Sequence, residues 1–296
     1  MRASELMILL GIVYGATACT REENPYFLTS LILDLPGPIP TRAADPDEVR
    51  ISDYNMLIYN SFGDLEEKVY VPARALRLHE GHIEYSTTLL RDVPYTVLAA
   101  VNLGYELPCL SMDEAREYRY HLAYPDEYSR GLPMAASLEN VVLGERVEVP
   151  LERLMARIDL QVDGSALPDD VQWLVREVSI GNCPSSVTPF APSTAEDRFT
   201  RGFRKEGREL EALNAGKPLS FYLLEDDSGK ACLEIRTEYH SSEWHSAPGE
   251  YLSYRLEVGA VQRNTCYGIT VTPAEVPSGS AARHLSNKVF SVRKIP

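Results

Sequence analysis

The sequence has little positive charge and none of the short motifs that bind phosphate. Asp and Glu outnumber Lys and Arg by 43 to 29 over 296 residues, and no stretch gathers enough Lys or Arg to neutralise a run of phosphates. The glycine patterns GxGxxG and GxxxxGK do not occur, and neither does the GxSxG elbow of many hydrolases. These absences argue against a nucleic-acid partner, nucleotide chemistry and a catalytic triad.

Long apolar runs are scarce, and the one that bears on export lies among the first residues. Leu6 to Gly15 is shorter than the ~20 residues that a membrane-spanning helix needs, but it has the length of a signal-peptide core. Small residues then precede Cys19, as in the lipobox of bacterial lipoproteins. We expect residues 1–18 to be a signal peptide and Cys19 to be lipidated. An ordinary signal peptide is the alternative, and both lead to export.

Cysteine is also sparse, with five in the chain. The four beyond Cys19 show no CxxC spacing, so no metal or redox motif is indicated. An oxidising compartment would leave three ways of pairing them. We nevertheless expect most of them to be buried free thiols, because Cys packs as a small apolar residue. They are Cys109, Cys183, Cys232 and Cys266.

The chain has only six histidines, and their two groupings favour no metal site. His79 and His82 would point to opposite faces of an extended strand, which is poor geometry for one ion. His240, Glu243 and His245 fall in a polar segment that could gather them around an ion or a sugar, although a solvated hairpin loop is favoured. No metal and no cofactor are predicted.

Acidic and aromatic residues do not indicate an enzyme or a clear ligand platform. Asp169 and Asp170 precede a turn, where Asp commonly hydrogen-bonds its own backbone, so acid–base catalysis is not indicated. The 17 tyrosines are spread along the chain, and Tyr is a preferred strand residue. Carbohydrate binding stays open, and we expect no enzymatic activity.

Alternation of apolar and polar residues predicts an all-β protein. Short, evenly spaced strands bounded by turn residues are typical of β-sandwiches. One segment differs, because Ser111 and Glu114 form a capping box that predicts a short helix from Met112 to Leu122. The strand at 154–162 is expected to close the first core. Strands are predicted at 26–35, 54–60, 69–78, 82–90, 95–101, 147–149, 154–162, 219–224, 232–237, 252–258, 267–271 and 288–295.

Two breaks in this pattern suggest the domain organisation. A proline-rich segment follows the first strand, and we expect it to be an exposed, protease-accessible loop. The turn-forming residues from Gly164 to Asp170 are the best domain boundary. The sequence therefore predicts a lipidated leader with the first strand at 19–42, an N-terminal sandwich at 43–165 and a C-terminal sandwich at 166–296.

Motifs along almost the whole chain resemble the fimbrillin-like proteins of Bacteroidales. Cys19, the strand Tyr26 to Leu35, the loop with Thr41 to Ala43 and the strand Tyr54 to Asn60 follow one another as in fimbrillin precursors. Later segments resemble the end of the family's first domain and the strands of its second domain. These segments are Gly131 to Ala135, Val149 to Val162, Gly181 to Pro184, Phe221 to Glu225 and Gln262 to Tyr267.

The resemblance implies two transthyretin-like β-sandwich domains in tandem and a structural role in a surface pilus, or fimbrium, that supports cell adhesion. It implies export as a lipoprotein held in the outer membrane by a lipid on Cys19, palmitate being the expected chain. It also implies that an arginine-specific protease cuts the loop after the first strand, here between Arg42 and Ala43. The implied partners are other fimbrial subunits and an adhesion target on a host or another bacterium.

Loss of the first strand would explain assembly in physical terms. It would leave unpaired backbone groups beside an apolar core, which a strand from another subunit can fill by β-augmentation. Arg283 to Pro296 is the candidate donor. Stalk, anchor and tip roles stay open, since an anchor would keep its first strand and Arg42 uncut. The alternatives are a monomeric surface lipoprotein that binds glycan or host protein, and a hydrolase with catalytic groups gathered from distant loops.

Overall fold

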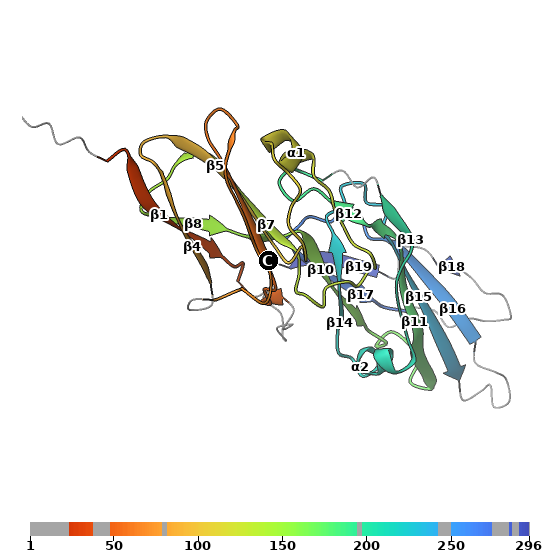
Figure 1. The fold of residues 1–296 in the computed structure, drawn as a ribbon. Helices are drawn as coiled ribbons and strands as arrows, with labels where there is room; N and C mark the ends of the chain where they lie inside the picture. The colour runs from red at the N-terminus through yellow and green to blue at the C-terminus, as the bar shows by residue number, and fades with distance from the viewer. Residues whose placement is uncertain are drawn as a thin grey trace, which may run out of the picture.

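The computed structural model describes residues 24–37, 48–78, 82–193, 197–241, 250–273, 284–285 and 290–295. Strands dominate these residues and form two packed parts, one from each half of the chain (Figure 1). The predicted all-β fold with a short helix in the first part is confirmed. No helix in the described ranges is long and apolar enough to cross a membrane. The helices are α1 (Met112–Glu117), η2 (Gly207–Leu210) and α2 (Glu211–Asn214).

The first half of the chain forms a sandwich of two sheets around one apolar core. One sheet has the strand order β3-β2-β5-β7-β9, and the other has the order β4-β1-β8. Side chains from both sheets meet in a single cluster, as the alternating patterns require. The strands are β1 (Tyr26–Asp34), β2 (Tyr54–Tyr59), β3 (Leu65–Val71), β4 (Ile83–Leu90), β5 (Pro94–Val101), β7 (Met134–Val142), β8 (Arg146–Pro150) and β9 (Glu152–Arg153).

Strand β2 is buried on both faces because the segment after β5 lies over its outer side. The Asn55 side chain donates to the Tyr105 carbonyl at 3.0 Å and accepts from the Leu107 amide at 2.8 Å. The Tyr59 hydroxyl donates to the Ser111 carbonyl at 3.1 Å. These bonds fix the covering segment and explain why β2 is apolar on both faces.

Helix α1 lies in this covering segment and begins as predicted. Ser111 and Glu114 form the capping box in both directions. The predicted end at Leu122 is wrong, because Tyr118 leaves the helix with φ −59° and ψ 135°. The chain then forms the short strand β6 (Tyr120–His121), which pairs with β12 (Ser186–Val187). Pairing with a distant strand therefore overrides the helical spacing of Leu122.

The second half of the chain also forms a two-sheet sandwich around its own core. The sheets have the orders β14-β10-β17-β19 and β13-β11-β15-β16-β18. Their strands are β10 (Met155–Val162), β11 (Val171–Pro184), β13 (Arg198–Glu206), β14 (Leu219–Leu224), β15 (Cys232–Ser241), β16 (Glu250–Glu257), β17 (Cys266–Val271), β18 (His284–Leu285) and β19 (Phe290–Ile295).

Strand β10 corrects one expectation, since it does not close the first core. It pairs with β14 and β17, and Ala156, Ile158 and Leu160 lie in the second core. Only Met155 at its start belongs to the first core. A period-two pattern shows which residues share a face, but it does not show which sheet the strand joins. We therefore propose that the two domains divide just before β10 rather than near residue 165.

Other strands also differ from prediction. The strand expected at 69–78 is β3, which ends at Val71 because Pro72 cannot continue the ladder and a turn follows. Strand β13 escaped prediction, because its many charged residues hide the alternation. All four cysteines in the described residues are free and buried, which confirms that prediction for Cys109, Cys183, Cys232 and Cys266.

Candidate functional site

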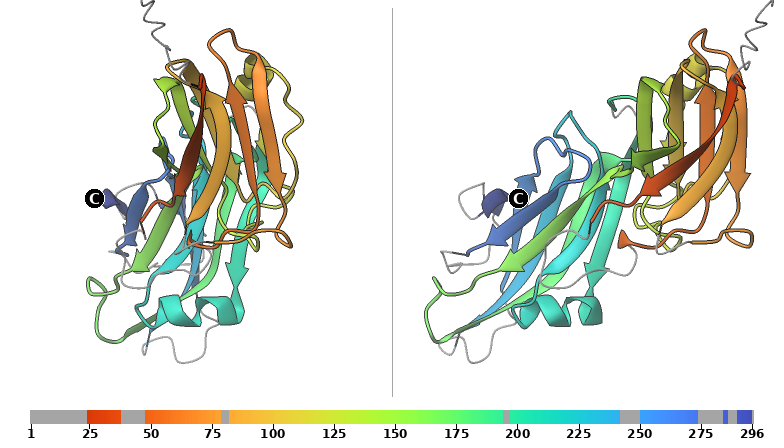
Figure 2. Two further views of the ribbon diagram at one scale, coloured as in Figure 1. Left: turned by 60° about the vertical axis from the view of Figure 1, so that its left-hand side comes forward. Right: turned by 90° about the vertical axis from the view of Figure 1, so that its left-hand side faces the viewer.

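Strand β1 holds the small sheet of the first sandwich together. It pairs antiparallel with β4 from Tyr26 opposite Leu90 to Leu33 opposite Ile83, and parallel with β8 from Ser30 opposite Arg146 to Asp34 opposite Pro150. Figure 2 shows β1 in red between these two neighbours. No other strand in the described residues joins β4 to β8. Removing β1 would expose two unpaired strand edges at once, a space that we call the β1 groove.

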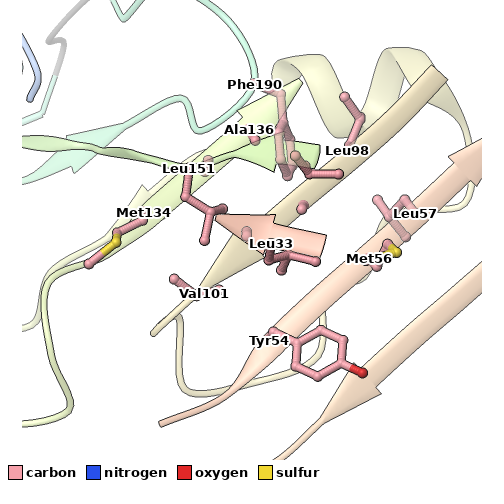
Figure 3. Packing of buried hydrophobic residues seen from close by; sticks show 14 of the residues in the cluster. Leu33, Tyr54, Met56, Leu57, Leu98, Val101, Met134, Ala136, Leu151 and Phe190 are labelled. Carbon is pink, nitrogen blue, oxygen red and sulfur yellow. The ribbon is translucent and has the colours of Figure 1, made fainter. Parts of the chain in front are cut away.

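One face of β1 fills part of the first core. Leu31 and Leu33 are both 0% exposed, and Phe27 and Leu35 pack against the same cluster. Figure 3 shows Leu33 in the cluster that also contains Met56 of β2, Val101 of β5 and Leu151, which lies between β8 and β9. Thr29, also on this face, is buried and donates its hydroxyl to the Gly144 carbonyl at 2.5 Å. The predicted inward face of the first strand is therefore confirmed.

The chain on either side of residues 38–47 is held by one buried arginine. Arg153 is 1% exposed, and its Nη2 donates to the carbonyls of Pro36 at 3.2 Å and Gly37 at 3.0 Å. The same Nη2 donates to the Glu48 carbonyl at 3.3 Å, and Nη1 donates to Asn264 Oδ1 at 3.2 Å. Arg153 thus binds the end of the β1 segment and the return of the chain toward β2.

A second buried arginine completes this network through the side chain of Glu48. Arg157 Nη1 lies 2.7 Å from Glu48 Oε1, which also accepts from the Tyr222 hydroxyl at 2.8 Å. Arg157 Nε further pairs with Asp159 Oδ1 at 2.8 Å. Buried charges are costly unless they are paired, and Arg157 pairs here with both Glu48 and Asp159. Glu48 Oε2 and Arg153 Nε are buried without a hydrogen-bond partner. We call Glu48, Arg153, Arg157, Tyr222 and Asn264 the Arg153 clasp.

The clasp arginines carry different pKa shifts with clear causes. Burial lowers the pKa of Arg153, and nearby Glu48 offsets part of this effect. Burial would also lower the pKa of Arg157, but its hydrogen bonds to Asp159 and Glu48 raise the pKa above the ordinary value. Because an ordinary arginine titrates far above neutrality, both side chains stay cationic at pH 7. The clasp is therefore an ionic tie across the boundary of the two sandwiches.

Strand β19, within the predicted donor segment, lies at the edge of a second-half sheet. It pairs only with β17, from Val271 opposite Phe290 to Cys266 opposite Ile295. Its four central residues are exposed, and Phe290 makes an edge contact with Tyr254 at 6.4 Å between ring centroids. The C-terminal strand therefore contributes little to the second core.

The residues predicted for lipidation and cleavage cannot be placed. Cys19, Arg42 and Ala43 lie outside the described residues, as do His79, Glu243 and His245. His240 is described, and its Nε2 lies 3.1 Å from Glu238 Oε1. Within the described part of the chain, no three His, Cys, Asp or Glu side chains are placed to hold a metal ion.

Sequence reasoning missed a small cavity over the first sandwich. It measures about 250 Å³, and Tyr105, Tyr120, His121, Glu127 and Arg130 help to line it. These residues come from the long connection between β5 and β7, where no spacing rule links them. Tyr105 is 40% exposed and Tyr120 is buried, so one tyrosine ring of the two can meet a ligand from solvent.

The clasp also escaped the sequence analysis. Arg153 lies in a stretch that reads as an ordinary strand, and an arginine there is expected to be exposed, because Arg is almost never fully buried. Its partners are distant in the chain, at residues 36–37, 48 and 264. The one available signal was the spacing of Arg153 and Arg157 within an otherwise apolar stretch, which places two cations where a core strand is expected.

The same fold occurs in solved structures of bacterial surface proteins. A Parabacteroides distasonis protein named for a presumed role in cell adhesion is 13% identical with a TM-score of 0.64, covering 90% of this chain and 96% of its own. The tip fimbrial protein Mfa3 of Porphyromonas gingivalis is 13% identical with a TM-score of 0.54, covering 90% and 98%. A fimbrilin of that species is 13% identical with a TM-score of 0.51, covering 83% and 89%.

This likeness establishes the fold. The resemblance to fimbrillin-like proteins that the sequence suggested is confirmed at that level. The sequence matches no protein-family model and no curated protein sequence.

Proposed function

We propose that this chain is a structural subunit of a surface pilus that supports cell adhesion, and that it joins its neighbour by exchange of strand β1. The observation that carries the proposal is the place of β1: it lies in the centre of its sheet, just before the proposed cut, and its inward leucines are fully buried. A central strand that can be removed by one cut leaves a groove that only another strand can fill. Proteins of the same fold are named as fimbrial proteins.

The route to the surface follows from the N-terminal sequence. In this proposal residues 1–18 are removed, and a lipid on Cys19 holds the chain in the outer membrane. A protease then cuts between Arg42 and Ala43, and the β1 groove accepts a strand from another fimbrial subunit. The chain acts by binding and packing, without catalysis or a cofactor.

The test is mass spectrometry of the protein recovered from the native cell surface, compared before and after an arginine-specific protease. We expect the assembled chain to begin at Ala43 and to run as ladders with other subunits on a denaturing gel without heating. Arg42→Lys should stay uncut and unassembled. Arg50→Lys is the matched control, because it removes an arginine on the other side of Glu48 and should be cut normally. A chain that stays acylated at Cys19, intact and unassembled in the wild type contradicts the proposal.

A second candidate is a surface lipoprotein that binds glycan or a host protein, and the cavity near Tyr105 favours it. The cavity combines an exposed tyrosine with charged groups of both signs, a combination suited to a small saccharide. Glycan-array binding that is lost in Tyr105→Ala, with the intact chain monomeric at the surface, would support this function over the pilus subunit.

A further inference from the structure

We infer that the strand that fills the β1 groove comes from a chain of a different sequence, and that residues 284–295 of a second copy do not serve as this donor. The inference rests on the proposed function and adds the chemistry of the partner. That partner strand carries large apolar side chains at successive alternate positions and no charge on that face. The argument compares what the groove holds with what residues 284–295 offer.

On the inward face of β1, two positions hold fully buried apolar side chains and a third holds a buried uncharged one. Leu31 and Leu33 are fully buried in the first core. Thr29 is equally buried two residues before Leu31, and its hydroxyl is satisfied by the Gly144 carbonyl. Leu35 is only partly buried at the open end. A replacement strand must therefore supply two adjacent inward apolar residues and an uncharged residue at the position of Thr29.

Residues 284–295 offer only one pair of adjacent apolar residues on either face. On the odd-numbered face every apolar residue is separated from the next by Asn287, Ser291 or Arg293. On the even-numbered face Phe290 and Val292 are adjacent, with a lysine on each side. Those lysines are Lys288 and Lys294.

This single pair cannot enter the groove without burying a charge. When Phe290 and Val292 take the places of Leu31 and Leu33, Lys288 falls at the position of Thr29. When the strand enters in the opposite direction, Lys294 falls there. An ammonium group at this fully buried position loses its hydration. It would meet the Gly144 carbonyl and the carboxylate of Glu67, which accepts from Thr87 directly opposite Thr29 in β4. Because a buried ion pair seldom recovers the full cost of removing its charges from water, both directions are disfavoured.

Strand β19 is already paired within its own chain. Its six residues pair with β17 along their whole length, and Lys294 Nζ donates to Gln262 Oε1 at 2.9 Å. Entry into another copy's groove would give up this ladder for one that buries a lysine. A donor from a different chain has no such cost.

The experiment uses the full chain cut at Arg42 and synthetic peptides that carry the same solubilising tail. The cut chain is warmed with a fluorescent peptide of residues 26–35 until this peptide replaces the native fragment. Unlabelled peptides are then added, and their displacement of the fluorescent peptide is measured as a fall in its fluorescence anisotropy. We expect the 26–35 peptide to compete well, and the 284–295 peptide to compete roughly a hundredfold less well, as one buried charge implies. The 284–295 peptide with Lys288→Thr and Lys294→Leu should bind the groove with an affinity within about tenfold of that of the 26–35 peptide.

A matched control reverses the change. The affinity of the 26–35 peptide with Thr29→Lys for the groove should be about a hundredfold lower than that of the unchanged peptide, because the variant places a lysine at the same buried position. Size-exclusion chromatography of the cut chain alone should show a monomer.

Two results overturn the inference while leaving the proposed function intact: equal competition by the unchanged 284–295 peptide, or polymers of the cut chain alone. Failure of the labelled 26–35 peptide to enter the cut chain contradicts strand exchange itself, and with it the proposed function.

Discussion

Strands β1 and β19 lie at opposite ends of the described chain, and they are built in opposite ways. Strand β1 is central in its sheet, has two fully buried leucines and is followed by the Arg153 clasp. Strand β19 is an edge strand with four exposed residues and one neighbour. The first sandwich therefore cannot do without a strand in the place of β1, whereas the second core is nearly complete without β19. A strand that must be replaced suits an acceptor site.

The clasp adds a second step to the release of β1. A cut between residues 37 and 48 would leave Arg153 bound to Gly37 on one side and to Glu48 on the other. Two ladders and the buried face also hold the strand. In the proposed exchange, cleavage and strand release would therefore be separate events, and the groove would stay filled until an incoming strand competes.

The largest expected effect comes from breaking the clasp. Arg153→Met removes the donor to three carbonyls and leaves Glu48 with one fewer cation nearby, so we expect a loss of about 3–5 kcal/mol in the free energy of unfolding. The cut 19–42 fragment should also dissociate faster, as gel filtration after proteolysis would show. Arg293→Met on exposed β19 is the control and should change neither quantity. Retention of the fragment at the wild-type rate would show that the clasp does not hold β1.

The next effect comes from the buried face of β1. Leu33→Ala should cost about 2–5 kcal/mol in the free energy of unfolding, because it leaves a cavity in the first core. Leu28→Ala changes the same residue type on the same strand, but Leu28 is 63% exposed and the cost should be small. Urea denaturation of both variants gives the comparison. Equal costs would mean that β1 is not part of the core.

Several of these features follow from the sequence, and others could not. The inward face of β1 follows from period-two alternation, and the start of α1 follows from Ser111 and Glu114, because both depend on neighbours in the chain. The sheet that β10 joins depends on strands whose paired residues lie 59 or more positions away, and the partners of Arg153 lie more than 100 positions away. The spacing of Arg153 and Arg157 marks two cations in an apolar stretch, but it does not say which distant residues bind them, so the partners in the clasp needed the structure.

Amide hydrogen exchange should show different protection for β1 and β19 without any mutation. Amides from Ser30 to Leu33 of β1 lie between β4 and β8 and should exchange only through unfolding of the first sandwich. Amides of β19 belong to an edge strand with little burial and should exchange through local opening at much lower free energy. Mass spectrometry of peptic fragments over time would measure both. Similar protection of the two strands would remove the contrast between them.

The smallest effect is expected on β19 itself. Val292 is 45% exposed, and its neighbours Ser291 and Arg293 are exposed too, so Val292→Ala should change the free energy of unfolding by no more than about 0.5 kcal/mol. Phe290→Ala is the sharper variant, because its ring contacts Tyr254 in the second core. Urea curves of both variants would show how much of β19 the second core uses. A cost for Val292→Ala equal to that of Leu33→Ala would mean that β19 is as integral to its core as β1, and the asymmetry on which strand exchange depends would be lost.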